Sequence, residues 1–144
     1  MIYLQPNQSN EVIVTLYEKC SNVINPYFTW QLTDSDGNNH LIFTSDDNSY
    51  ASYYFNAFTL SVNSISATAT PFGLTNGNIY TNAGNYSYII YEMANPYDLD
   101  LNNAIGIVEV GLLNINGTYS NYVINTGNDN DTIVVNKNLN FYDQ

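Results

Sequence analysis

The chain has 144 residues and a formal net charge of −11, with 13 acidic side chains against two lysines, Lys19 and Lys137, and no arginine. Proteins grip nucleic acid by neutralising phosphates with clustered Lys and Arg, so two distant lysines argue against a nucleic-acid partner. One His, one Cys and no Arg also leave few ways to build an activated nucleophile, an acid–base relay or an anion clamp. Composition alone therefore indicates an acidic binding or structural domain.

The length and the absence of targeting signals predict one soluble domain over residues 1–144. Cys20 is the only cysteine, so an intrachain disulfide is excluded and a passive, half-buried thiol is expected. The first residues, MIYLQP, lack the basic and continuously apolar segments of a secretory signal, and no stretch is apolar enough to span a membrane. We therefore expect synthesis in a cytoplasm, no cofactor and no membrane partner.

The first expected strands follow from apolar residues that alternate at period two, with no sustained helical spacing. Residues 11–17 form one such strand, and residues 27–33 form the next. In the second strand Phe28, Trp30 and Leu32 share a face, and this places the only Trp of the chain in mid-strand. That position predicts that Trp30 packs in the core.

A hairpin is expected next, because residues 34–39 contain Asp-Gly at their centre, a pair that tolerates the positive φ of tight turns. Residues 40–44 should then return antiparallel to the Trp30 strand. Alternation resumes over residues 50–62 after a polar acidic loop. Residues 63–83 contain Pro, Gly, Ser, Thr and Asn and read mostly as irregular connection, in which short strands are an open alternative.

The second half contains the strongest strand signal, residues 83–92, which a loop at 93–103 connects to a strand at 105–115. Asn116-Gly117 predicts a tight hairpin with a return strand at 119–124, because both residues accept the left-handed conformation. A short strand at 132–135 and a tail at 136–144 complete the chain. This tail is a candidate C-terminal arm, and residues 1–6 are a second candidate anchor.

This series of short strands predicts an all-β fold, an immunoglobulin-like antiparallel β-sandwich of about 7–9 strands. Gly84-Asn85-Tyr86 sharpens the prediction, because such sandwiches carry a Tyr near the start of the sixth strand whose hydroxyl bonds backbone. Trp30, Tyr86 and Gly84 are therefore the expected structural residues. Tyr88 occupies the place of the second disulfide Cys of antibody domains. A partly open barrel is the alternative fold.

Three acidic loops are candidate calcium sites, because carboxylate and carbonyl oxygens can coordinate a hard cation. The loop at 34–39 lacks the Gly and Glu positions of an EF-hand, which favours a hairpin turn. The loop at 127–131 has suitable oxygen atoms, but solvated loops of this composition are common. Asp46-Asp47 is a weaker candidate. We therefore expect no metal ion, and the two longer loops stay open as calcium ligands.

The four glutamates fall on predicted strands or strand ends, where two of them could converge as a glycosidase pair. Exposed strand carboxylates that keep a sheet soluble are the simpler interpretation, and His40, beside a turn, is interpreted as a surface residue. On these grounds the chain is not expected to be an enzyme. The glutamates are Glu11, Glu18, Glu92 and Glu109.

Exposed tyrosines are the most informative surface feature, since Tyr brings a large rigid contact area and a hydroxyl at small entropic cost. They suit a protein interface or a sugar platform. The candidate interface residues are Tyr27, Tyr53, Tyr54, Tyr91, Tyr119, Phe141 and Tyr142.

Three segments occur in the order NPYFTWQLT (25–33), GNYSYIIYE (84–92) and VEVGLLNI (108–115). In this order they resemble small virion proteins of tailed phages that infect Bacteroidota, including crAss-like phages. The resemblance covers most of the chain, and its motifs are structural rather than catalytic. It implies an Ig-like auxiliary or decoration protein on the outer capsid surface, with the major capsid protein, other virion proteins and copies of itself as partners. A tail, fibre or adhesin module that binds host glycan is the alternative.

Overall fold

The protein is described here by a computed structural model, which covers residues 1–21, 24, 26–37, 40–51, 54–63 and 77–117. Two short 3-10 helices, η1 (Tyr17–Lys19) and η2 (Leu101–Asn103), lie in connections, and no helix of the described residues has the length and apolar character needed to cross a membrane. The strands of the described chain are β1 (Ile2–Leu4), β2 (Gln8–Val14), β3 (Tyr27–Asp34), β4 (His40–Thr44), β5 (Asn56–Asn63), β6 (Asn78–Tyr80), β7 (Gly84–Met93) and β8 (Ala104–Ile115).

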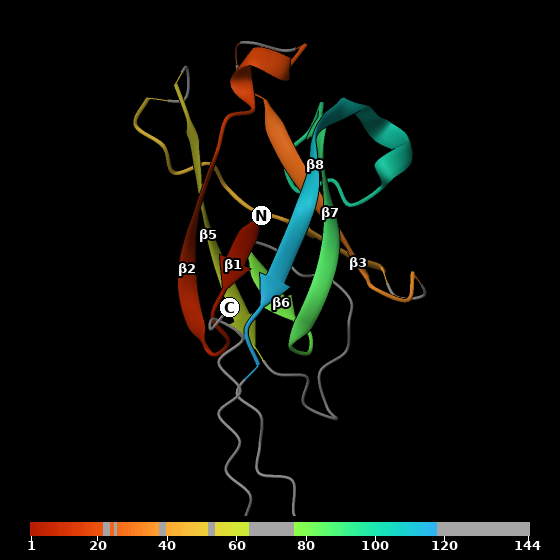
Figure 1. Cartoon of the computed structure of the whole chain (residues 1–144). Coiled ribbons are helices and arrows are strands. Elements are labelled where there is room, and N and C mark those ends of the chain that lie inside the picture. Colours follow the sequence, from red (N-terminus) through yellow and green to blue (C-terminus); the bar gives the residue numbers. More distant parts are fainter. Residues whose placement is uncertain (22–23, 25, 38–39, 52–53, 64–76, 118–144) are drawn as a thin grey trace, which may run out of the picture.

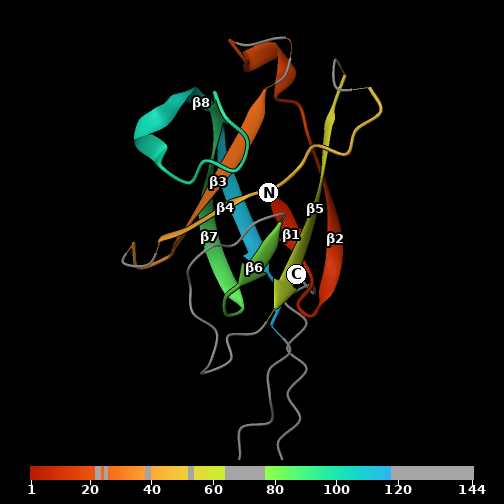
Figure 2. The ribbon, with the colours of Figure 1, turned by 180° about the vertical axis from the view of Figure 1, so that it is seen from behind.

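These strands form two packed sheets, a five-stranded sheet of order β1-β8-β7-β3-β4 and a three-stranded sheet of order β2-β5-β6 (Figures 1 and 2). The all-β, sandwich-like expectation is confirmed. The purely antiparallel one is wrong, because β1 runs parallel to β8 and β5 runs parallel to β6. Neither parallel pair is joined by a tight turn, so no connection forces its strands to run in opposite directions.

The alternation of apolar residues identified the buried faces correctly. Phe28, Trp30 and Leu32 of β3 are all buried between the sheets, and Phe58, Leu60 and Val62 of β5 face them from the other sheet. Since successive side chains of a strand point to opposite faces, the period-two pattern fixes the buried face before any partner strand is known.

The predicted hairpin between β3 and β4 is also confirmed. Gly37 has a φ of 73° and donates its N–H to the Asp34 carbonyl at 3.0 Å, and Thr33 pairs with His40 on the return strand. The positive φ explains why Gly follows Asp at this point, because residues with a Cβ adopt that conformation at a cost.

The first residues of the chain belong to the five-stranded sheet. Ile2–Leu4 forms the edge strand β1, whose Leu4 side chain is fully buried. At the other end of the described chain, Ile115 pairs with Gly84 of β7 on one side and with Leu4 of β1 on the other. The return strand predicted at 119–124 lies outside the described residues.

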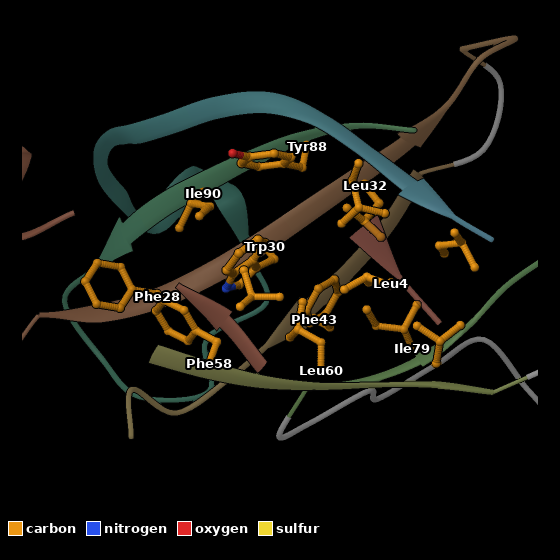
Figure 3. Packing of buried hydrophobic residues seen from close by; sticks show 14 of the residues in the cluster. Leu4, Phe28, Trp30, Leu32, Phe43, Phe58, Leu60, Ile79, Tyr88 and Ile90 are labelled. Atoms are coloured by element: carbon orange, nitrogen blue, oxygen red, sulfur yellow. The ribbon is translucent and has the colours of Figure 1, made fainter. Parts of the chain in front are cut away.

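Trp30 stands at the centre of the core (Figure 3). Its indole stacks with Phe43 at 5.9 Å between ring centroids, meets Phe58 edge-on at 5.3 Å and lies 5.7 Å from the Tyr88 ring. These partners come from β4, β5 and β7, so one side chain connects both sheets. Tyr88 of β7 therefore packs directly against Trp30 in the core.

Gly111 of β8 leaves the space that Tyr88 occupies, since a Cβ at this position would lie 2.7 Å from the Tyr88 ring. We predict that Gly111→Ala lowers the free energy of unfolding by about 1–3 kcal/mol, because Tyr88 must move away from Trp30. Gly106→Ala on the same strand is the matched control, as no atom lies within 4 Å of its Cβ position. Urea unfolding followed by Trp30 fluorescence measures both, and equal unfolding midpoints would contradict this packing.

Candidate functional site

The most distinctive surface of the protein is the outer face, defined as the face of the five-stranded sheet that points away from the three-stranded sheet. The cross-strand registers define rows of side chains across it. One row runs from Ile42 through Gln31 and Ile89 to Val110. Residues paired across strands lie on the same face, so these rows show which side chains share the surface.

The outer face carries no Asp, Glu or Lys at any strand position of the described chain. Its members, taken from the same registers, are Tyr3, Tyr27, Thr29, Gln31, Thr33, His40, Ile42, Thr44, Asn85, Ser87, Ile89, Tyr91, Met93, Ala104, Ile107, Val110, Leu112 and Asn114. Described acids lie instead in connections, on the other sheet or on the inner side. An uncharged face in a chain of net charge −11 is the pattern that an interface core shows, because charged residues are depleted there.

An apolar stripe marks one border of this face. Ile107, Val110 and Leu112 of β8 are all exposed, with Val110 at 61%. The stripe was not predicted, although the segment AIGIVEVGLLNI (104–115) contains a signal for it. Its apolar residues fall on both faces of the strand, which is more than a strand with one solvated face requires.

A second surface is the loop end, where the described residues of three connections lie at the same end of the sandwich (Figure 1): residues 15–21, 24 and 26, residues 45–51 and 54–55, and residues 94–103. The registers require this arrangement, because Val14 pairs with Asn56 and Tyr27 pairs with Met93 where these connections begin or finish. Side-chain bonds reinforce it. Thr29 donates its hydroxyl to the Asp98 carbonyl at 2.7 Å, and this contact buries Thr29 although it lies on the outer face.

The tyrosines predicted as an interface divide between these two surfaces. Tyr54 and Tyr27 are exposed near the loop end, whereas Tyr91 is only half-buried on the outer face and donates its hydroxyl to Gln31 Oε1 at 2.9 Å. Two further exposed tyrosines of the loop end are Tyr50, 92% exposed, and Tyr97. Tyr53, Tyr119, Phe141, Tyr142 and the expected arm at 136–144 lie outside the described residues.

The glutamates do not all behave as solvated strand carboxylates. Glu92 is 1% exposed and accepts the Ser21 N–H at 2.8 Å, so its expected exposure is wrong. The reason is local: Glu92 follows buried Ile90 at period two and therefore points inward. Glu109 forms an ion pair with Lys19 that joins η1 to β8. Glu11 and Glu18 are exposed.

Cys20 is half-buried and lies close enough to Glu92 for the carboxylate charge to act on it, and its properties agree with the expected passive thiol. Burial, with the Glu92 charge as the second cause, raises the pKa of the Cys20 thiol from 9.0 to about 11. The thiolate, which is the nucleophilic form, is therefore scarce at neutral pH. Because the pKa is raised in the folded chain, the free energy of unfolding falls as the pH rises through that interval.

The acidic connections use their carboxylates to shape the backbone. Asp47 accepts the N–H groups of Ser49 and Ala57, each at 3.0 Å, and Asp100 accepts the Asn102 N–H at 3.0 Å. Among the described residues no group of three metal-binding side chains occurs. His40 is exposed and contacts the Thr33 hydroxyl at 2.9 Å. The loop at 127–131 lies outside the described part of the chain.

Two of the three predicted structural residues, Gly84 and Tyr86, lie at the start of β7, whereas Trp30 lies in the middle of β3. Tyr86 donates its hydroxyl to the Asn82 carbonyl at 2.7 Å and shares a hydrogen bond of 2.9 Å with the Thr81 hydroxyl. Gly84 begins the strand beside the Tyr86 ring with a φ of 158°, a backbone conformation that residues with a Cβ rarely adopt. The Tyr86 side chain thus fixes the corner through which the chain enters β7.

No family model, curated protein or solved structure matches the chain in comparisons with each. The fold and the two surfaces therefore define the class of protein as an all-β, sandwich-like domain with one uncharged sheet face.

The contribution of the Tyr86 hydroxyl to stability can be measured directly. We predict that Tyr86→Phe lowers the free energy of unfolding by about 0.5–1.5 kcal/mol, because the chain loses the hydrogen bonds of the Tyr86 hydroxyl to the Asn82 carbonyl and the Thr81 hydroxyl. Tyr50→Phe is the control, since Tyr50 is almost fully exposed, and it should leave stability unchanged. Urea unfolding measures both variants. A Tyr86→Phe chain as stable as the wild type would show that the corner hydroxyl contributes nothing.

Proposed function

We propose that the protein is an immunoglobulin-like β-sandwich that serves as a non-enzymatic structural protein of a phage virion, bound to the outer surface of the capsid. The Ig-like assignment is supported by the Tyr86 hydroxyl bonded to backbone four residues upstream. It is also supported by Trp30 packed against Tyr88 across β3 and β7. The resemblance to small virion proteins supplies the setting.

The observation that carries the docking role is the uncharged outer face. A face that must stay in water gains nothing from excluding charge, whereas a face that becomes buried against a protein avoids the desolvation of unpaired ions. The acids on the remaining surface keep the exposed part of the molecule soluble and repel like particles. The outer face is thus the side turned toward the capsid, and the loop end is free to project from it.

A second candidate function rests on the loop end. Three connections rich in Asn, Ser and Tyr present Tyr50, Tyr54 and Tyr97 at one end of the sandwich. Rigid aromatic side chains surrounded by small polar ones are the composition that binding loops favour. This arrangement fits a tail, fibre or adhesin module whose loop end binds host-surface glycan.

The capsid role is tested on purified particles of the phage that encodes the chain. We predict that quantitative mass spectrometry finds the protein in a copy number comparable with that of the major capsid protein. Heads separated from tails should retain it, and a map of the particle should place its outer face against the shell. A few copies per virion, or retention by the tails alone, would refute the capsid role.

The glycan role makes a different prediction, measured on a glycan array with the purified chain. Binding to a neutral glycan, weakened at least about tenfold by Tyr50→Ala and unchanged by Tyr3→Ala, would establish the loop end as a sugar site, because a stacked aromatic ring contributes on the order of 1.4 kcal/mol or more. Tyr3 is the control because it is exposed on β1, away from the loops. No binding to any glycan would eliminate this second candidate.

A further inference from the structure

Among the strands that the structure describes, β8 is a sheet edge for most of its length. β7 pairs with it on one side, and β1 pairs with it on the other only at Leu113–Ile115. In the part of the chain that the structure describes, no strand lies beside residues 104–112 on the β1 side (Figure 1). We call residues 104–112 the open edge. An unpaired edge exposes backbone donors and acceptors in the geometry that pairs with another strand.

The open edge lacks the usual protection against pairing. Proteins protect such edges with Lys or Pro, but β8 contains neither, and its exposed side chains are apolar. Its one charge, on Glu109, is compensated by Lys19. Two irregularities in the pairing with β7, after Ile90 and after Glu92, confine the regular stretch of the open edge to residues 109–112. A short strand that continues the line of β1 would lie beside this stretch.

The side chains on this stretch define what an added strand must carry. Val110 and Leu112 point to the outer face, and their cross-strand neighbours Ile89 and Ser87 are uncharged. Apolar or hydroxyl side chains at alternate positions of the incoming strand would extend this surface, because cross-strand neighbours contact one another.

The net charge of the chain favours a basic segment over a second copy of the chain as the strand that pairs with the open edge. Described acids lie at both ends of the five-stranded sheet: Asp34, the last residue of β3, and Asp36 of the β3–β4 turn at one end, and Asp98 and Asp100 of the connection that leads into β8 at the other. Lys19 is already paired with Glu109, so the described chain has no further lysine for such an interface. A second copy would bring the same net charge of −11, whereas a segment flanked by Lys or Arg would complement the acidic ends.

We propose that the open edge of β8 receives, by strand addition, an extended segment of another virion protein whose apolar and hydroxyl side chains alternate and whose ends carry Lys or Arg. This inference rests on the docking role proposed above and names its mode and the chemistry of its partner. Backbone pairing supplies the affinity in such complexes, and the alternate side chains supply the specificity.

A pair of synthetic peptides tests the proposal on the isotope-labelled full chain. The probes are KKTVTVTVKK and its acidic counterpart EETVTVTVEE, titrated while the backbone amide resonances are recorded. We expect the basic peptide to bind saturably with a dissociation constant below about 1 mM and to shift the amides of residues 109–112, while the acidic peptide binds at least about tenfold more weakly. Absence of saturable binding, shifts confined to the loop end, or equal affinity for both peptides would overturn the proposal.

Val110→Asn is the variant that tests the site, because it removes exposed apolar area without changing the charge. It should weaken binding of the basic peptide about tenfold, because the variant lacks the apolar side chain that the peptide would cover. Ile13→Asn is the matched control: Ile13 is 60% exposed, nearly the same as Val110, but lies on β2 in the other sheet. Equal losses in the two variants would overturn the site.

Two further measurements separate the competing explanations. A wild-type dimer in sedimentation that Val110→Asn dissociates would show that a second copy occupies the edge, and it would refute the basic partner. Purified capsids lacking the chain provide the other measurement. Capsids that bind Val110→Asn as tightly as wild type would refute strand addition but leave the capsid role standing. Capsids that bind neither chain, with the peptide result intact, would refute the capsid role alone.

Discussion

The packing of Trp30 is the interaction on which the rest of the structure depends. Its indole contacts Phe43, Phe58 and Tyr88 at once, and these residues bring together strands of both sheets. In a chain with a single cysteine no disulfide can join the sheets, so aromatic packing holds them together instead. Because the core is closely packed, even one added methyl group displaces its neighbours. The packing of Tyr88 against Trp30 therefore also depends on Gly111, where a Cβ would collide with the Tyr88 ring.

The inner faces of the packed sheets and the outer face of the five-stranded sheet carry different kinds of side chain. The inner faces bury the apolar residues, and they also take in Glu92, whose carboxylate is held by the Ser21 N–H. The outer face of the five-stranded sheet retains uncharged side chains only, while the acids of the described chain collect elsewhere. Net charge by itself says little about fold, but its distribution over a folded surface indicates which side can approach another protein without desolvating ions.

The loop end and the open edge lie on different parts of this framework and would serve different partners. Loop positions can vary in sequence while the strands beneath them stay fixed, which suits recognition of a changing ligand. Strand addition depends mainly on hydrogen bonds between backbones, so it suits a partner whose structure does not change, such as a shell protein. A molecule with both surfaces could attach by its sheet and present its loops outward, consistent with the proposed decoration role and with its adhesin alternative.

The sequence by itself determined the local features. The alternation in residues 27–33 identified the buried face of β3, the Asp-Gly pair located the β3–β4 turn, and Tyr86 was recognised as a corner residue from its place at the start of a strand. Each of these depends on a period or a turn within a few residues, where local sterics decide the outcome.

Tertiary structure decided what depends on residues far apart in the chain. The parallel pairing of β1 with β8, the burial of Thr29 beneath the connection at 94–103 and the open edge of β8 all require knowing which segments become neighbours. The candidate docking surface belongs to this second group. Its members come from β1, β3, β4, β7 and β8, and only the register between these strands places their uncharged side chains on one face, because pairing is a long-range property that no local pattern specifies.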